Sequence, residues 1–248
     1  MTSFIAALQF LLLTPAFIRR PFSPDELGRS VAFYPLVGLL LGGILAAADA
    51  LFGLLWPIPV RSALVLALWV IVTGGLHLDG FLDSCDGLLG GSTPERRLEI
   101  MRDERVGAFG VAGGVLLLLL MFSSLSTLAG DRWAALLLAP VLGRFGMSLA
   151  VVALPYARDS GLGRDIKDHA RRSDLLVAAL IALASAIAVA LLLQSLAPVV
   201  VLLAAAAVYW LGTSFVLRRI PGMTGDTYGA TNMLMEATTL LVFAAMLW

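Results

Sequence analysis

The sequence predicts an all-α integral membrane protein, a polytopic helical bundle with about six to eight membrane segments. Of its 248 residues, 60% are hydrophobic and only 14% are charged, and the mean hydropathy is +0.94. A soluble domain of this size lacks the polar surface needed to cover so much apolar material. Several mostly apolar stretches are also long enough to cross a bilayer as a helix. We expect residues 1–248 to form a single membrane domain.

Seven apolar stretches are candidate spans, separated by polar connections. The candidate spans are residues 31–54, 61–78, 110–129, 133–154, 174–195, 198–217 and 236–248. Residues 4–18 are also apolar, but they are short and contain Pro15, so they either span, lie at the interface or re-enter. A signal peptide is a poor interpretation of this segment, because Arg19 and Arg20 follow the apolar run.

Basic residues gather in alternate connections. Arginines precede the spans that begin at residues 31, 110, 174 and 236, whereas the opposite connections carry only Arg61 and Arg132. Because cytoplasmic loops are enriched in Lys and Arg, the long polar loops are predicted to face the cytoplasm. We therefore expect a multi-pass protein in a lipid bilayer, with its catalytic face on the cytoplasmic side.

Charge is most concentrated between residues 74 and 110. There, Asp79, Asp83 and Asp86 have i, i+4, i+7 spacing, which puts three carboxylates on one face of a helix. Like charges at the end of a membrane segment repel one another and lose solvation, so they need a positive partner. Mg²⁺ prefers hard oxygen ligands and often bridges carboxylates to substrate phosphates. We expect a Mg²⁺ site here; the alternative is a solvated acidic helix end.

A short amphipathic surface helix is predicted over residues 94–105. Ser92 or Thr93 supplies a hydroxyl cap before Pro94 and Glu95, which is typical of a helix start. Acids and arginines alternate along this segment. Ion pairing along the helix is therefore an alternative to a binding role.

Four charged residues near the end of this segment are candidates for the same site. Glu99 and Asp103 share a helix face and are candidate metal ligands. Arg102 and Arg105 adjoin these acids, and a guanidinium matches phosphate oxygens bidentately. We expect the two arginines to contact phosphate.

Two later polar segments carry further candidates. The connection at 155–174 is net basic and contains Lys167, so it either binds an anionic ligand or only sets the membrane orientation. The segment that follows residue 220 places Asp226 in a turn, with Asn232 and Glu236 on one helix face beyond it. Glu236 opens the last apolar segment, where a carboxylate without a partner is unfavourable.

Arg144 lies inside an apolar span, where a cation usually pairs with an anion of the protein or of a ligand. Asp49 is also in a span, near its outer end, and is expected to have a structural partner or to be exposed. One cysteine and two histidines argue against a zinc site. These features predict an enzyme acting on phosphate-bearing substrates with Mg²⁺. A transporter is the competing class, but its acids should lie nearer the membrane midplane.

Four motifs resemble those of one known family. They are GGLHLDGFLDSCDGLLGG, RRLEIMRDERVGAFG, YARDSGLG and GMTGDTYGATN, in this order. Together they resemble the characteristic sequence motifs of the adenosylcobinamide-GDP ribazoletransferase family, whose members are also called cobalamin synthases. The resemblance covers essentially the whole chain. The stretch DGFLDSCD also resembles the start of the CDP-alcohol phosphotransferase signature, but this chain lacks the rest of that signature.

The resemblance implies a transferase of adenosylcobalamin biosynthesis that assembles the nucleotide loop. Adenosylcobinamide-GDP reacts with α-ribazole, or with its 5′-phosphate, to give adenosylcobalamin, or its 5′-phosphate, and GMP. The resemblance also implies a Mg²⁺-dependent enzyme of the bacterial cytoplasmic membrane. No nucleic-acid partner is expected, and the chain is expected either to form a homo-oligomer or to associate with other corrinoid enzymes.

The resemblance gives the candidate residues their roles in displacing GMP from a pyrophosphate. The metal candidates are Asp79, Asp83, Asp86, Glu99 and Asp103. The substrate-binding candidates are Arg102, Arg144, Asp226, Asn232 and Lys167. The catalytic candidates are Asp83, Asp86, His77 and Arg105. A carboxylate or His77 accepts the proton of the attacking hydroxyl, or His77 is only a hydrogen-bonded structural residue.

Overall fold

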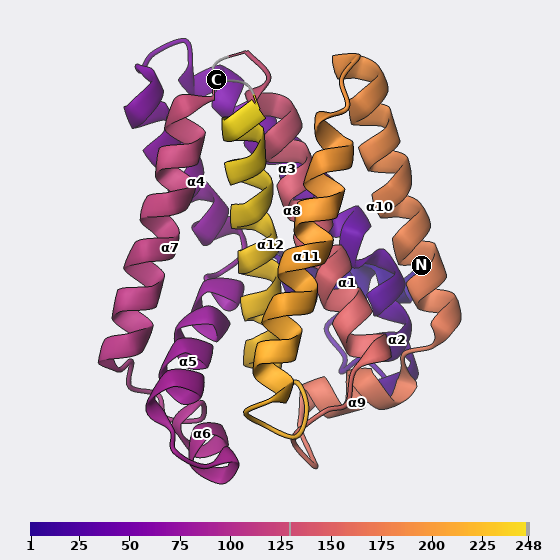
Figure 1. The fold of residues 1–248 in the computed structure, drawn as a ribbon. Coiled ribbons are helices and arrows are strands. Elements are labelled where there is room, and N and C mark those ends of the chain that lie inside the picture. Colours follow the sequence, from indigo (N-terminus) through magenta and orange to yellow (C-terminus); the bar gives the residue numbers. More distant parts are fainter. Residues whose placement is uncertain (129, 247–248) are drawn as a thin grey trace.

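The computed structural model describes residues 1–128 and 130–246, which form a helical bundle (Figure 1). Its elements are α1 (Thr2–Leu11), α2 (Pro24–Ser30), the 3-10 turn η1 (Val31–Phe33), α3 (Tyr34–Phe52), α4 (Ile58–Val72), α5 (Leu76–Gly90), α6 (Pro94–Ile100), α7 (Ala108–Thr127), α8 (Arg132–Ala153), α9 (Leu162–His169), α10 (Arg172–Leu193), α11 (Ala197–Leu217) and α12 (Gly225–Met246). The prediction of an all-α bundle is confirmed.

Long apolar helices dominate the bundle. Within the described residues, six helical segments are long and apolar enough to cross a membrane, and the bent pair α4–α5 makes a seventh if it is one span. The predicted spans at 31–54, 110–129, 133–154, 174–195 and 198–217 correspond to α3, α7, α8, α10 and α11. The ambiguous segment 4–18 contains the short helix α1, which has 10 residues.

The predicted span 61–78 was wrong in its extent, because the chain bends sharply inside it. The axes of α4 and α5 meet at 88°. Gly74 and Gly75 form the bend with φ values of +61° and +69°, a left-handed conformation that favours glycine. The helix that carries the acidic cluster is therefore separate from α4 and lies below it in Figure 1.

The predicted span 236–248 was also wrong, because its helix begins earlier. Helix α12 starts at Gly225, so Glu236 lies in its middle and does not open it. The first turns of α12 pack against α5 and α8. Their polar residues face protein, so the hydropathy pattern did not reveal the start of the span. Residues 247–248 of the predicted span lie outside the described part of the chain.

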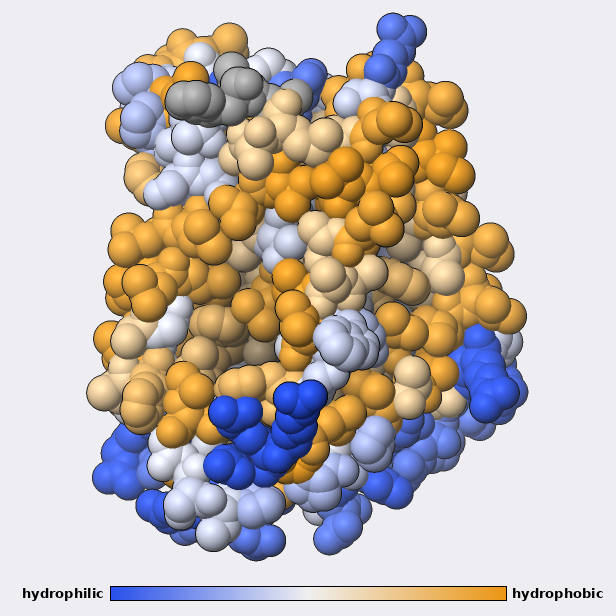
Figure 2. All heavy atoms as spheres, viewed as in Figure 1, coloured by the Kyte–Doolittle hydropathy of each residue, from blue (hydrophilic) through white to orange (hydrophobic). Residues whose placement is uncertain are grey.

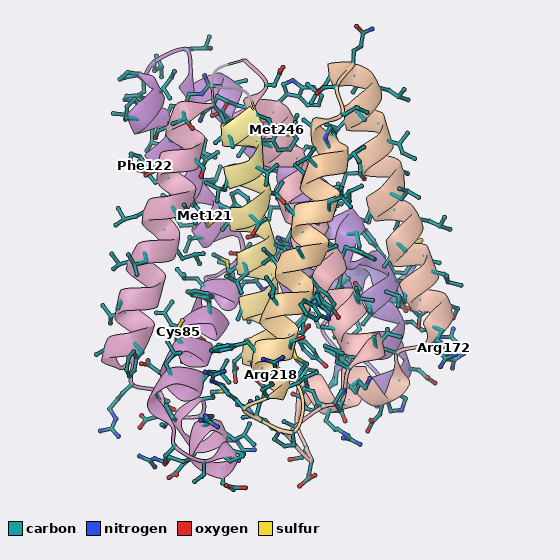
Figure 3. All side chains as sticks on the ribbon, in the orientation of Figure 1. Cys85, Met121, Phe122, Arg172, Arg218 and Met246 are labelled. Atoms are coloured by element: carbon teal, nitrogen blue, oxygen red, sulfur yellow. The ribbon has the colours of Figure 1, made fainter. Side chains whose placement is uncertain are left out.

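The surface has a broad apolar belt between two more polar ends. Figure 2 shows hydrophobic side chains over the middle and hydrophilic ones gathered at the lower end. Arg172 and Arg218 lie towards this lower end, whereas Met246 lies at the opposite end (Figure 3). We call the lower end, with α6, α9 and the connections 101–107, 154–161 and 218–224, the basic end. This surface is that of a multi-pass membrane protein.

A buried charge cluster ties together the helices at the opposite end. The guanidinium of Arg132 donates a 2.7 Å hydrogen bond to Asp49, and Arg61 forms an ion pair with the same carboxylate. Arg132 also donates to the hydroxyl of Ser62 at 3.2 Å. The expectation that Asp49 has a structural partner is confirmed.

Candidate active site

Helices α5 and α12 cross closely at the basic end of the bundle. A Cβ atom added to Gly80 would lie 2.9 Å from the backbone oxygen of Asp226, and one added to Gly229 would lie 3.3 Å from the backbone oxygen of His77. Only the absence of side chains at the two glycines permits this approach. The crossing brings the TGDTYGA segment against the acidic helix α5.

Three carboxylates meet near this crossing. Asp79 and Asp83 come from α5 and Asp226 from the first turn of α12, and the charges of Asp79 and Asp226 both act on Asp83. Arg158 forms an ion pair with Asp226 at 2.6 Å. Within the described chain, no ion pair neutralises Asp79 or Asp83. The cluster therefore has an excess of negative charge.

Backbone pairing between two connections places Arg158. The amide of Ala157 donates to the oxygen of Met223 at 2.8 Å, and the amide of Met223 donates to the oxygen of Pro155 at 2.8 Å. These bonds form one parallel bridge between Tyr156 and Met223. The bridge holds the YARDSGLG segment beside the start of α12.

Tyr156 stacks on Tyr228 of α12, with ring centroids 5.9 Å apart. Burial raises the pKa of the Tyr156 phenol, and the positive charges of Arg158 and Arg102 oppose this rise. Arg102 is exposed, and its charge reaches the same corner of the protein as Arg158. Whether Arg102 and Arg105 contact phosphate stays a prediction.

Asp86 has a structural partner in helix α7. Its carboxylate accepts hydrogen bonds from the backbone amides of Gly107, at 2.7 Å, and Gly110, at 2.8 Å. Gly107 is the N-cap residue of α7 and Gly110 lies in its first turn, where backbone donors have no partner within the helix. Asp86 thus caps α7, and a metal role would compete with these bonds.

The surface helix is shorter than predicted, since α6 ends at Ile100, and its acids pair locally. Of the two predicted cap residues, Ser92 and Thr93, it is Thr93 that caps the helix. Its hydroxyl oxygen accepts a hydrogen bond of 3.3 Å from the backbone amide of Arg96. Glu99 pairs with Arg96 at 2.7 Å.

Asp103 pairs with Arg105 at 2.9 Å. The hydrogen bond from Arg105 lowers the pKa of Asp103 to about 2. In residues 1–128 and 130–246, no group of three or more Asp, Glu, His or Cys side chains is arranged to hold a metal ion. The predicted five-residue metal shell is therefore not assembled.

Arg144 and Asn232 lie in the protein core, away from solvent. Arg144 is fully buried and forms an ion pair with Glu236, and its Nη1 atom lies 3.4 Å from the side-chain oxygen of Asn232. Both side chains lie between α8 and α12, where Glu236 neutralises Arg144, and the predicted contact of Arg144 and Asn232 with the substrate stays a prediction.

Lys167, which was predicted to bind an anionic ligand, donates hydrogen bonds to the protein backbone. Its ammonium donates to the carbonyl oxygens of Val151 at 2.8 Å and Val152 at 3.1 Å, in the last turn of α8. Burial lowers the pKa of Lys167. The positive charge stabilises the negative end of the α8 dipole.

His77 is 2% exposed and lines a cavity beside Asp79 and Asp226. Its Nε2 atom has no hydrogen-bond partner among the described residues. The alternative of a fully hydrogen-bonded structural histidine is thus not supported.

Two members of the site, Arg158 and Tyr156, were given no specific role from sequence. Both stand in the YARDSGLG motif, which was the available signal. Arg158 lies 68 positions from its partner Asp226, and only the fold shows their contact.

A comparison with known protein families identifies the family of this chain. The family described as cobalamin-5-phosphate synthase matches residues 3–244. The chain belongs to the cobalamin-5-phosphate synthase family. The family predicted from the four motifs is thereby confirmed.

The following relatives of this member of the cobalamin-5-phosphate synthase family share the same protein name. The adenosylcobinamide-GDP ribazoletransferase of Pseudomonas syringae pv. syringae is 42% identical over 246 residues, which cover 98% of this chain and 99% of the relative. That of Pseudomonas aeruginosa (strain UCBPP-PA14) is 43% identical over 247 residues, covering 98% and 97%. That of Roseiflexus sp. is 38% identical over 239 residues, covering 94% and 86%. No solved structure is similar enough to this chain to match.

The carboxylates at the crossing are chemically suited to Mg²⁺. Mg²⁺ usually takes one or two protein carboxylates and completes its shell with waters and substrate phosphates. Asp79 and Asp83 supply two hard oxygen donors without a neutralising cation in the described chain. A preformed cage of three or more protein ligands is not required.

Proposed function

We propose that this chain is an adenosylcobinamide-GDP ribazoletransferase with its active site where α5, α12 and the 154–161 connection meet. It joins adenosylcobinamide-GDP to α-ribazole, or to its 5′-phosphate, and releases GMP in the assembly of the cobalamin nucleotide loop. The observation that carries this assignment is the meeting of Asp79, Asp83 and Asp226 with Arg158 at the basic end. The relatives' shared name supports the reaction.

Mg²⁺ is the cofactor of this proposal. Asp79 and Asp83 would hold it, whereas the Asp226 carboxylate is already bonded to Arg158. When bound, the ion neutralises the pyrophosphate and stabilises the charge that develops on the leaving GMP. Asp86, Glu99 and Asp103 are left out of the shell, because they already accept bonds from α7 or from neighbouring arginines.

The chain's own residues position the reacting groups. Arg158 fixes the Asp226 carboxylate, and Arg102 supplies a flexible positive charge for phosphate oxygens. The ribose 3′-oxygen forms a bond to the phosphorus attached to the cobinamide arm, and the bond from that phosphorus to the GMP oxygen breaks. The hydroxyl proton passes to a carboxylate of this cluster or to His77.

The basic end is proposed to face the cytoplasm of a bacterial cell, with the protein in the cytoplasmic membrane. Connections at this end carry Arg102, Arg158, Arg171 and Arg218. The opposite end carries Arg61 and Arg132, which form ion pairs with Asp49. An excess of Lys and Arg is typical of cytoplasmic loops.

Release of GMP by the purified protein in detergent micelles tests this function. With both substrates and Mg²⁺, we expect stoichiometric GMP and corrinoid product, loss of activity with EDTA, and recovery when excess Mg²⁺ is added. Micelles enclose no compartment, so turnover there also excludes obligatory transport. Absence of GMP from a folded preparation would contradict the assignment, and full activity in EDTA would contradict the metal proposal alone.

A further inference from the structure

A cavity of about 200 Å³ opens beside the carboxylate cluster. Asp79 and Asp226 line one part of it. The remaining wall is largely apolar and is contributed by α1, α3, α8 and α9, through residues such as Phe10, Met147 and Ile166. A ligand in this cavity would be in contact with the carboxylates of the proposed active site.

Three buried polar groups in the cavity wall have no partner among the described residues. Tyr34 is 1% exposed and Tyr228 is 4% exposed, and neither their hydroxyls nor the Nε2 atom of His77 has a hydrogen-bond partner in this part of the chain. Buried polar atoms are hydrogen-bonded in most proteins, and exceptions often mark a site that a ligand completes. Apolar walls with a few polar groups are typical of small-molecule sites.

We propose that this cavity binds the aromatic base of the acceptor nucleoside, α-ribazole. This inference rests on the proposed function, which supplies the two substrates. The cavity is too small for a corrin ring. Guanine carries polar groups around most of its edge, which the apolar wall could not satisfy. A base with a hydrocarbon ring and few nitrogen atoms suits the wall, with Tyr228 and His77 as its hydrogen-bonding groups.

The position of the cavity also suits the reaction. A base held between Tyr228 and Met147 places the attached ribose towards Asp79 and Asp226, which line the same space. The attacking hydroxyl is on this ribose. Binding of the base in the cavity therefore orients the nucleophile towards the proposed metal site.

Removal of the Tyr228 hydroxyl tests the assignment. For Tyr228→Phe we expect the KM for α-ribazole to rise roughly three- to tenfold, as for one lost hydrogen bond, with the KM for adenosylcobinamide-GDP unchanged. Tyr209→Phe is the matched control. Its hydroxyl also lacks a partner in the described chain, but it lines a different cavity between α5, α11 and α12. We expect this variant to retain both KM values.

Direct binding gives a readout that does not need turnover. Equilibrium dialysis of α-ribazole alone with the Asp83→Asn protein should show binding, and a second change, Val151→Phe, should abolish it by filling the cavity. If Val151→Phe fails to fold, Met147→Ala provides the opposite test. The enlarged cavity should improve the use of a riboside with a bulkier aromatic base relative to α-ribazole.

The outcomes separate this inference from the proposed function. If Tyr228→Phe and the cavity variants leave the KM for α-ribazole unchanged while GMP release continues, the inference is overturned and the function stands. A selective rise in the KM for adenosylcobinamide-GDP would overturn it too, because it would place guanine in the cavity. If the wild-type protein releases no GMP, the function fails, and dialysis still decides whether the cavity binds the nucleoside.

Discussion

Arg158 donates a hydrogen bond of 2.6 Å to the carboxylate of Asp226, although 68 positions separate these residues in the sequence. The bond links the 154–161 connection to the first turn of α12. A hydrogen bond between charged groups contributes about 1.5–3 kcal/mol. The pair therefore orders the first turn of α12, which carries Asp226 and lies far from α5 in the sequence.

Arg158→Ala should lower kcat about tenfold or more, because Asp226 loses its partner and repels Asp79 and Asp83. The measurement is GMP release at saturating substrate and Mg²⁺. Arg164→Ala in the adjacent helix α9 is the control, since Arg164 pairs with Asp168 at the exposed surface. Equal losses in both variants would contradict a specific role for Arg158.

Gly80→Ala should impair both stability and activity, because its Cβ would lie 2.9 Å from the Asp226 backbone oxygen. Neither backbone can move aside without separating α5 from α12. Thermal unfolding in detergent and GMP release measure the two effects. Gly43→Ala is the control, as its Cβ would meet nothing within 4 Å, and an unchanged Gly80→Ala protein would show that the crossing is looser than described.

Arg144→Met should destabilise the protein by about 3–5 kcal/mol, because Glu236 would become an unpaired buried charge. The double variant Arg144→Met and Glu236→Met should regain most of the lost stability, measured by thermal unfolding, and should release GMP. A stable but inactive double variant would instead support the predicted role of Arg144 in substrate binding.

Asp86→Asn should lower stability by about 1–2 kcal/mol, because its side chain keeps only one oxygen for the two amides of α7. The Mg²⁺ concentration for half-maximal GMP release should not change. An increase of tenfold or more in that concentration would return Asp86 to the metal shell.

Much of the fold was predictable because lipid-facing helices leave a strong hydropathy signal. The spans corresponding to α7, α10 and α11 are of this kind. The start of α12 was missed because polar Asp226 and Asn232 face other helices there. The bend between α4 and α5 depends on the backbone conformation of two glycines inside an apolar stretch.

The candidate site was predictable in its residue types but not in its partners. Spacing correctly placed Asp79 and Asp83 on one helix, but only the fold brings them near Asp226 of the later TGDTYGA motif. Periodicity could not show that Asp86 turns to the amides of α7, or that Arg144 is neutralised by Glu236. Such distinctions require knowledge of which helices are neighbours.

The central claim is that Asp79 and Asp83, and not the acids of the surface segment, form the catalytic metal site. The most direct test compares GMP release by Asp79→Asn and Asp83→Asn with release by Glu99→Gln and Asp103→Asn, at saturating Mg²⁺ in micelles. We predict a loss of roughly 100-fold or more in the first two variants, comparable to removal of an electrostatic stabiliser, and near-normal rates in the other two. Near-normal turnover in both Asp79→Asn and Asp83→Asn would contradict the account.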